Sequence, residues 1–461
     1  MATDAEITPP LFFVLAKLAR GFGSAPGLIR LPSMLAGILL VPVIFGIGRI
    51  AVGRRAACVA AAIVSLSPFL IYFSGNARAY SVMLLMVAAS TFCLLMAARD
   101  GHRRWWAGYA VFVCLAMYSH YTAAFILAGQ FGWALWAMPT ARKPLLAATA
   151  LAALAFVPWL PSLSADLDSP TTDFLQGLEP HTISERWSAF EQVMFIRPGD
   201  AGGGFFSRPD VILAVLGIGL ALAVLAVRVV RRIPVSLAED EVEHGVSLVI
   251  VLTLAAPVAS ILLGLVGTDV SGIRELATTW VGLPLLAGML MAATGRYWGL
   301  AATVLVLTGL TIGSVHLADA SKSAFAYRDA AAWLDENADP SAVIVDDSSL
   351  SPSPATPLDA YLDRGRTEYR LRVPIDSPDY METFTSPDPL PLITEAFSSG
   401  GEVFVVSLGQ PFPVGADGKV VYRGQDLEIA RGWRVSSRQS FDGVLPVTVT
   451  GFSRDAAAGS D

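Results

Sequence analysis

The chain has 461 residues, of which 54% are hydrophobic and 15% are charged, and its net charge is −7. This composition is too apolar and too poor in charge for an ordinary soluble enzyme, so lipid is expected to surround much of the chain. The five histidines and three cysteines lack the spacing of a structural zinc site. We therefore expect no cofactor, and a divalent cation would have to be held by carboxylates.

The N-terminal segment, residues 1–30, places Asp4 and Glu6 just before a Pro-Pro pair that interrupts regular structure. The apolar run that follows contains Lys17 and Arg20, which disfavour a membrane span. We expect an amphipathic helix that lies along the outer membrane surface. A solvated tail is the alternative for the two carboxylates.

Ten stretches are apolar enough to cross a hydrocarbon core, which needs roughly 20 residues. They lie near residues 32–50, 56–75, 80–98, 105–119, 121–138, 145–163, 210–228, 246–267, 276–294 and 298–317. The predicted fold is an α-helical polytopic membrane domain over residues 31–317, followed by a soluble α/β domain over residues 318–461.

The loops between these stretches alternate in charge. One set is rich in basic residues: Arg49, Arg54, Arg55, Arg99, Arg103, Arg104, Arg142, Lys143, Arg228, Arg231, Arg232 and Arg296. The other set contains Arg78, the long loop 164–209 and Arg274. The positive-inside rule places the first set in the cytoplasm, and the second set with the C-terminal domain outside. Residues 1–30 are then also external, and something must carry them across the membrane. We expect either that a first transmembrane helix lies upstream of this sequence, or that helix 32–50 translocates the tail in reverse orientation.

The external turn from Ser74 to Ser81 contains Asn76, Arg78 and Tyr80. An arginine at this depth presents a planar pair of donors suited to the oxygens of a lipid phosphate. The alternative is an arginine that only anchors the end of a helix.

The next external turn contains His120 and Tyr121 between two apolar helices. These side chains can bind sugar hydroxyls or phosphate, or they belong to an interfacial aromatic belt. Loop 164–209 mixes acids, aromatic residues and glycines, which suits either a mobile lid or a plain connection. The last external turn carries Arg274, which can clamp a phosphate together with Arg78 or pair with Asp269 or Glu275.

The C-terminal domain alternates helices and strands, which predicts a small α/β fold. We expect helices over Tyr327–Asn337 and Pro389–Phe397, strands over Ala342–Asp346 and Glu402–Leu408, and a hairpin of Trp433–Phe441 with Leu445–Phe452. No Gly-rich phosphate loop or nucleophile elbow occurs in it, so we interpret it as an acceptor-binding or structural cap.

A run of short motifs extends along the first third of the chain: Thr8–Leu11, Gly23, Arg30–Ser33, Gly53–Ala56, Ser67–Leu70, Asn76–Ser81 and Ser119–Thr122. In its order and spacing this run resembles glycosyltransferase family 39, which includes protein O-mannosyltransferases and aminoarabinose transferases acting on lipid A. The resemblance covers about the first 165 residues, and beyond them Arg274 occupies a place similar to that of the family's late external arginine. It implies a GT-C fold, a polyprenyl-phosphate-sugar donor, inversion at the anomeric carbon and a catalytic carboxylate in the first external loop.

Two departures from the family concern the N-terminus. The family usually has His or Lys before the Pro-Pro pair, where this chain has Thr8. The family's acidic motif normally ends the first transmembrane helix, upstream of where this sequence begins. Within the chain, the candidates for the catalytic carboxylate are therefore Asp4 and Glu6.

The predicted function is a multi-pass cell-membrane glycosyltransferase, a mannosyltransferase-like hexosyl- or pentosyltransferase. Its expected partners are a polyprenyl-phosphate sugar, membrane lipid and a cell-envelope acceptor (glycan, lipid or protein), with no nucleic acid. The predicted phosphate-stabilising cations are Arg78 and Arg274. The alternatives are a lipid-linked-sugar transporter or flippase, and a catalytically inactive GT-C scaffold.

Overall fold

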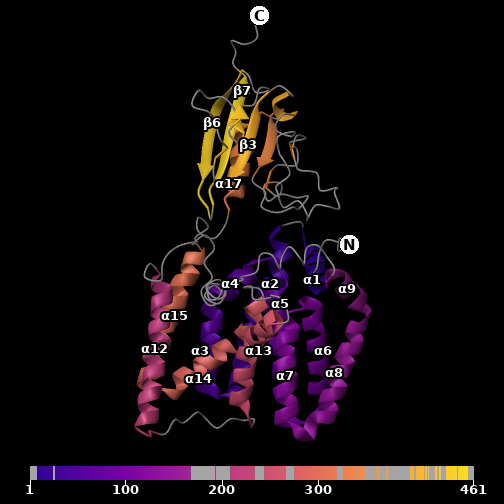
Figure 1. Cartoon of the computed structure of the whole chain (residues 1–461), viewed down its shortest axis with the longest axis vertical. Helices are drawn as coiled ribbons and strands as arrows, with labels where there is room; N and C mark the ends of the chain where they lie inside the picture. Colours follow the sequence, from indigo (N-terminus) through magenta and orange to yellow (C-terminus); the bar gives the residue numbers. More distant parts are fainter. Residues whose placement is uncertain are drawn as a thin grey trace, which may run out of the picture. The chain divides into compact units, whose positions relative to one another are not determined.

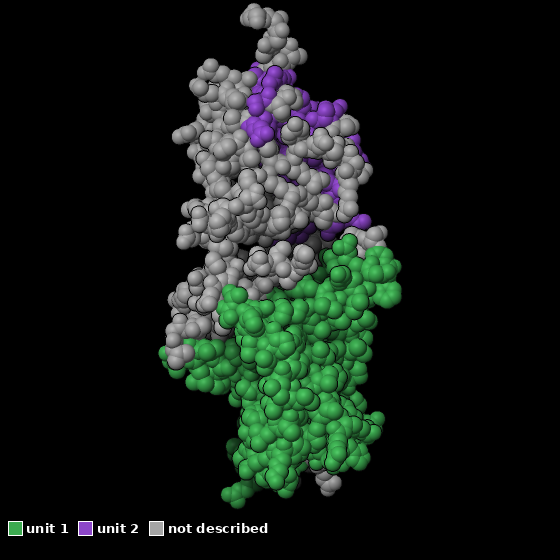
Figure 2. Space-filling model, turned by 90° about the vertical axis from the view of Figure 1, so that its right-hand side faces the viewer, with its two compact units in different colours: residues 1–197, 202–315 green, residues 198–201, 316–461 purple. Residues whose placement is uncertain are grey.

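The computed structural model places a large part of the chain. The described residues are 8–23, 26–167, 193, 208–233, 243–265, 275–318, 325–339, 341–347, 358, 361–362, 370–371, 395–398, 401–409, 411–412, 414, 421–422, 425–426, 432–443 and 445–454. The chain divides into two compact units, residues 1–197 with 202–315 and residues 198–201 with 316–461 (Figure 2).

The first unit is helical (Figure 1). Its α-helices are α1 (Leu11–Arg20), α2 (Leu31–Ala51), α3 (Arg54–Leu66), α4 (Pro68–Gly75), α5 (Tyr80–Asp100), α6 (Arg103–Ser119), α7 (Ala123–Ala137), α8 (Arg142–Phe156), α9 (Leu160–Leu167), α12 (Pro209–Val230), α13 (Gly245–Leu265), α14 (Leu283–Ala293) and α15 (Arg296–Ala318). Short 3₁₀ helices are η1 (Pro26–Arg30), η2 (Pro139–Ala141), η3 (Val157–Trp159) and η5 (Glu275–Val281). Each of the ten predicted apolar stretches coincides with helix in this set.

Membrane-spanning character is clear in these helices. Within the described part of the chain, seven helical stretches are long and apolar enough to cross a membrane, and the bent pair α3 and α4 makes an eighth if it forms one span. Helices α6 and α7 are shorter, with 17 and 15 residues. The protein is therefore a polytopic α-helical membrane protein, as its composition predicts.

The predicted continuous span 56–75 is wrong in one respect, because it is two helices that meet at 52°. Pro68 has no backbone N–H to donate and disfavours helical geometry at the residue before it. Ser67 accordingly has an extended backbone, with φ −70° and ψ 119°. Its Oγ accepts a hydrogen bond from the Leu70 backbone N–H at 3.3 Å, so the second helix starts with a side-chain cap.

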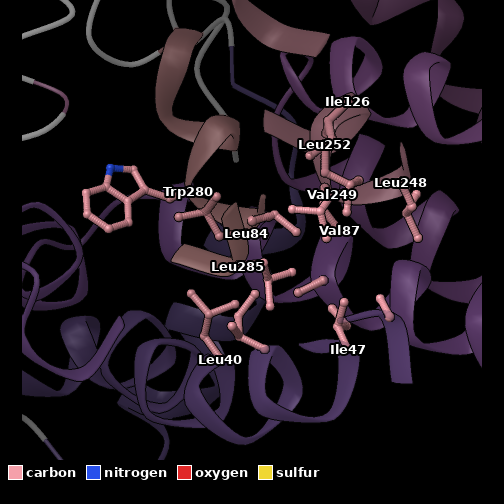
Figure 3. Close-up of a cluster of buried hydrophobic side chains, with 14 of the residues drawn as sticks. Leu40, Ile47, Leu84, Val87, Ile126, Leu248, Val249, Leu252, Trp280 and Leu285 are labelled. Atoms are coloured by element: carbon pink, nitrogen blue, oxygen red, sulfur yellow. The ribbon is translucent and has the colours of Figure 1, made fainter. Parts of the chain in front are cut away.

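Aliphatic side chains from five helices fill the centre of the bundle (Figure 3). Leu40 of α2, Leu84 of α5 and Leu285 of α14 are at most 1% exposed. Glycine allows the closest approach, because a Cβ on Gly288 of α14 would collide with the carbonyl oxygen of Ala56 of α3. Such small-residue contacts hold membrane helices together where the hydrophobic effect between them is weak.

A polar contact crosses the apolar interior between α5 and α7. The Oε1 of Gln130 accepts a hydrogen bond from Ser90 Oγ at 3.3 Å, and its Nε2 donates to Thr91 Oγ1 at 3.2 Å. All three side chains are fully buried. The amide is thus paired on both sides within protein, which a polar group at this depth requires.

The connections differ between the two ends of the bundle (Figure 1). Helices α2, α5 and α7 finish at the end that carries Arg49, Arg99 and Arg142, whereas α5 and α7 begin at the end with Arg78 and His120. At the former end, Arg228 of α12 donates from Nη1 to the carbonyl oxygen of Thr294 at 3.2 Å.

The second unit is an α/β domain around a five-stranded sheet of order β2-β1-β3-β7-β6. The strands are β1 (Val343–Asp347), β2 (Arg370–Leu371), β3 (Val403–Leu408), β6 (Trp433–Phe441) and β7 (Val447–Arg454), beside a separate pair, β4 (Val421–Tyr422) and β5 (Gln425–Asp426). Strand β1 pairs in parallel with β2 and β3, and β7 pairs antiparallel with β3 and β6.

The two faces of this sheet bury different clusters. Helix α17 (Tyr327–Asn337) packs through Leu334 against a cluster that includes Phe404. The other cluster includes Phe397 and Phe452, whose rings lie 5.4 Å apart. The predicted helix at Tyr327, the two predicted strands and the hairpin are confirmed. The predicted helix Pro389–Phe397 lies largely outside the described residues.

Candidate functional site

The turn between α4 and α5 presents Arg78. Its side chain is exposed, and within the described part of the chain it makes no hydrogen bond or ion pair. Its backbone is held on both sides: the N–H donates to the carbonyl oxygen of Asn76 at 2.9 Å, and the carbonyl oxygen accepts from Ser33 Oγ at 2.9 Å. A flexible cationic side chain therefore projects from a fixed backbone, an arrangement suited to binding an anion.

Helix α1 supports this turn. Phe12 and Ala16 of α1 share a buried cluster with Ala36 of α2 and with Ala79, the residue after Arg78. Ala79 is 3% exposed. The predicted amphipathic helix therefore forms, and its buried face closes over the base of the Arg78 turn.

Tyr80 is the first residue of α5 and is 8% exposed. Its ring centroid lies 4.9 Å from that of Phe73 of α4 and 5.0 Å from that of His120. Aromatic pairs at these separations stabilise a fixed ring orientation. Tyr80 thereby joins the Arg78 turn to the turn that follows α6.

His120 ends α6 with an extended backbone and is half-buried. The Thr122 backbone N–H donates to its Nδ1 at 3.3 Å, and Thr122 Oγ1 lies 2.9 Å from the same atom. An Nδ1 that accepts from a backbone N–H carries no proton, so a neutral His120 has its proton on Nε2.

Tyr121 is tied to the connection after α8. Its hydroxyl accepts a hydrogen bond from Trp159 Nε1 of η3 at 2.9 Å. Tyr118 packs on the same indole, with ring centroids 6.2 Å apart. The position of the Tyr121 hydroxyl is therefore fixed by an indole that itself packs on Tyr118.

The structure thus brings together five of the eight residues that the sequence indicates. Asn76 and Arg78 share one turn, Tyr80 contacts His120, and Tyr121 follows His120 directly. Asp4, Glu6 and Arg274 lie outside the described residues. In the part of the chain that is described, no group of three or more His, Cys, Asp or Glu side chains is arranged to hold a metal ion.

Three supporting residues were missed from the sequence. Ser33 lies in a motif of the family resemblance, but its bond to the Arg78 carbonyl depends on the packing of α2 against α4 and α5. Trp159 and Phe73 are ordinary aromatic residues of apolar stretches until the fold sets them beside Tyr121 and Tyr80. No local signal in the sequence distinguishes them.

The second unit has a polar depression of about 730 Å³ beside the start of β3. It is lined by Asn337, Asp339, Ser341, Glu402 and Arg454, among others. Asp339 Oδ1 accepts from the backbone N–H and the hydroxyl of Ser341 at 2.8 and 2.6 Å, so part of this polar surface is satisfied within its own turn.

Membrane helices that meet in polar turns at one end, beside an exposed arginine, define a polytopic membrane protein. Residues 8–161, which contain every described residue of the candidate site, match the family of dolichyl-phosphate-mannose-protein mannosyltransferases. The predicted resemblance to glycosyltransferase family 39, which includes protein O-mannosyltransferases, is confirmed over this third of the chain. The comparison with curated proteins gives no match.

Several solved structures are similar to the chain at low identity. ArnT from Cupriavidus metallidurans bound to undecaprenyl phosphate is 14% identical, with 98% of this chain and 89% of that chain covered and a TM-score of 0.46. The oligosaccharyltransferase of Archaeoglobus fulgidus tethered with an acceptor peptide is 12% identical, with 98% and 66% covered and a TM-score of 0.48. The arabinofuranosyltransferase AftD from Mycobacteria is 16% identical, with 96% and 36% covered and a TM-score of 0.44.

Proposed function

We propose that this protein is a membrane glycosyltransferase that takes a sugar from a polyprenyl-phosphate donor and transfers it to a cell-envelope acceptor at the outer face. The observation that carries the proposal is the exposed guanidinium of Arg78, to which the described residues offer no anionic partner. It stands within the segment that matches a family named for a lipid-phosphate sugar donor.

The chemistry requires positive charge where the phosphate departs. The acceptor hydroxyl attacks the anomeric carbon, the bond from that carbon to the phosphate oxygen breaks, and the lipid phosphate leaves with the electron pair. Arg78 is suited to bind that phosphate through two parallel N–H donors. Arg274 supplies a second cation from the last external turn.

The remaining site residues take roles that match their hydrogen bonds. The ring of His120 is held by Thr122 and that of Tyr121 by Trp159, and we assign both residues to contacts with a sugar hydroxyl or a phosphate oxygen. The acceptor proton passes to a carboxylate acting as general base, for which Asp4 and Glu6 are the candidates in this sequence. Attack opposite the departing phosphate inverts the anomeric carbon.

The outer-face assignment rests on charge. The end of the bundle with Arg49, Arg99 and Arg142 is the cation-rich end, and such connections face the cytoplasm in membrane proteins. The Arg78 turn is then extracytoplasmic, where a translocated lipid-linked sugar presents its headgroup. On the same reasoning we propose that the C-terminal α/β domain is extracytoplasmic and contributes to acceptor binding.

A transfer assay tests the proposal. Membranes that overexpress the chain are incubated with a panel of radiolabelled polyprenyl-phosphate sugars, and label is measured in lipid, glycan and protein fractions. We expect label from at least one donor to reach an envelope fraction above the level in membranes without the chain. If no donor gives transfer, the enzymatic assignment is wrong. It is also wrong if the purified protein, reconstituted in proteoliposomes, moves lipid-linked sugar across the bilayer without transferring the sugar.

A further inference from the structure

Trp280 of η5 takes part in a continuous row of aromatic rings that ends at the candidate donor site. Its indole stacks on the ring of Phe69, with ring centroids 5.8 Å apart and an interplanar angle of 14°. The ring centroids of Phe69 and Phe73 lie 4.6 Å apart. The ring centroid of Tyr80 lies 4.9 Å from that of Phe73 and 5.0 Å from that of His120. The row therefore links η5, α4, the start of α5 and the end of α6.

The first members of this row have little freedom. Trp280 is 2% exposed and Phe69 is fully buried. Figure 3 shows the indole of Trp280 directed away from the aliphatic residues around Leu285, with its nitrogen on the far side. That nitrogen donates a hydrogen bond to the carbonyl oxygen of Val193 at 2.8 Å, and Val193 is itself fully buried. Trp280 is thus fixed by a hydrogen bond on one side and by ring stacking on the other.

We infer that Trp280 is a positioning residue for the donor site, setting the orientation of Tyr80 and His120 through Phe69 and Phe73. The inference rests on the proposed function and names a residue that touches none of the proposed ligands. Packed rings transmit displacement because interiors are too dense to absorb it. Phe69, the second member of the row, lies just beyond the α3–α4 break, where Pro68 leaves the orientation of α4 dependent on such tertiary contacts.

Four substitutions distinguish an effect carried by the aromatic row from a general loss of stability. Trp280→Leu removes both the stack and the N–H donor, whereas Trp280→Phe removes the donor but keeps a smaller aromatic ring that can still stack. Phe69→Leu interrupts the row without touching Val193. Trp133→Leu is the matched control. Trp133 is 4% exposed, and its Nε1 also donates a hydrogen bond, to Ser247 Oγ at 2.9 Å. It lies near the end of α7 that is farther from His120.

Two measurements on purified full-length protein are needed. The first is the donor KM and kcat of transfer, and the second is the rate at which diethyl pyrocarbonate modifies His120, followed by mass spectrometry. We expect Trp280→Leu and Phe69→Leu to raise the donor KM by about two- to thirtyfold, the range of couplings carried through packed residues. The rate of His120 modification should change in the same two variants. Trp280→Phe should give an intermediate rate, and Trp133→Leu should have the rate of the wild type.

The outcomes distinguish this inference from the proposed function. An unchanged donor KM in folded Trp280→Leu protein overturns the inference, whether or not His120 modification changes. An equal rise in Trp133→Leu overturns it as well, because a general loss of stability then explains the effect. If the wild type transfers no sugar but His120 modification responds to Trp280→Leu and not to Trp133→Leu, the proposed function fails while the positioning of His120 by Trp280 stands.

Discussion

The ring of Tyr80 lies 5.0 Å from the ring of His120, and this contact joins the turn before α5 to the turn after α6. Arg78 precedes Tyr80 by two residues, and Tyr121 follows His120. The contact therefore brings the turn that carries Arg78 next to the turn that carries His120 and Tyr121.

Replacement of Arg78 should separate charge from geometry. Arg78→Lys keeps the positive charge but loses the pair of parallel N–H donors, so we expect a partial loss of transfer, whereas Arg78→Ala should lose more. A lost charge-assisted hydrogen bond costs about 1.5–3 kcal/mol, which corresponds to roughly ten- to a hundredfold in donor KM. Steady-state kinetics of both variants give the comparison.

The control for Arg78 is Arg55→Ala, an exposed arginine at the first turn of α3. It should leave the donor KM unchanged. Equal kinetics for Arg78→Ala and Arg55→Ala in folded protein would assign Arg78 to anchoring the helix end only.

The Tyr121 and Trp159 pair should separate a structural hydrogen bond from a ligand contact. Tyr121→Phe and Trp159→Phe each break the same 2.9 Å bond, so each should lower stability by about 1 kcal/mol, and the double variant should lose little more. Only Tyr121→Phe removes a donor to the ligand, so it alone should lower transfer further. Thermal unfolding and donor kinetics of the wild type and the three variants complete a double-mutant cycle. Equal activity in both single variants would leave Tyr121 with its structural bond alone.

Gln130→Leu should affect stability and not the site. It removes both hydrogen bonds of Gln130, but Ser90 and Thr91 each retain a bond to the carbonyl oxygen of Val87. Hydrogen bonds between membrane helices contribute about 0.6 kcal/mol each on average, so the expected loss is about 1 kcal/mol. We expect a lower unfolding temperature with an unchanged donor KM. A raised donor KM would instead place this contact in communication with the site.

Gly288→Ala tests the packing of α14 on α3. A methyl group there would collide with the carbonyl oxygen of Ala56, which is backbone and cannot rotate away. We expect a loss of roughly 1–3 kcal/mol or a failure to accumulate folded protein. Gly219→Ala in α12 is the control, because a Cβ at that position meets no atom within 4 Å. Similar stability for the two variants would contradict the described contact.

The sequence predicts the elements better than their contacts. Arg78 is recognisable without a structure, because it is a lone cation in a short connection between apolar stretches. The bend at Ser67 is marked by Pro68, yet the apolar run continues through it and hides the change of direction. The row from Trp280 to His120 has no such mark, because its members come from segments whose proximity only the folded bundle establishes.

Direct binding of polyprenyl phosphate measures the central claim without depending on the identity of the sugar or the acceptor. Purified wild-type protein, Arg78→Ala and Arg55→Ala are titrated with polyprenyl phosphate in lipid nanodiscs, and bound lipid is counted by native mass spectrometry. We predict saturable binding to the wild type and to Arg55→Ala, and an affinity about ten- to a hundredfold lower for Arg78→Ala. Equal affinity in all three proteins, or no saturable binding to the wild type, would contradict a donor site at Arg78.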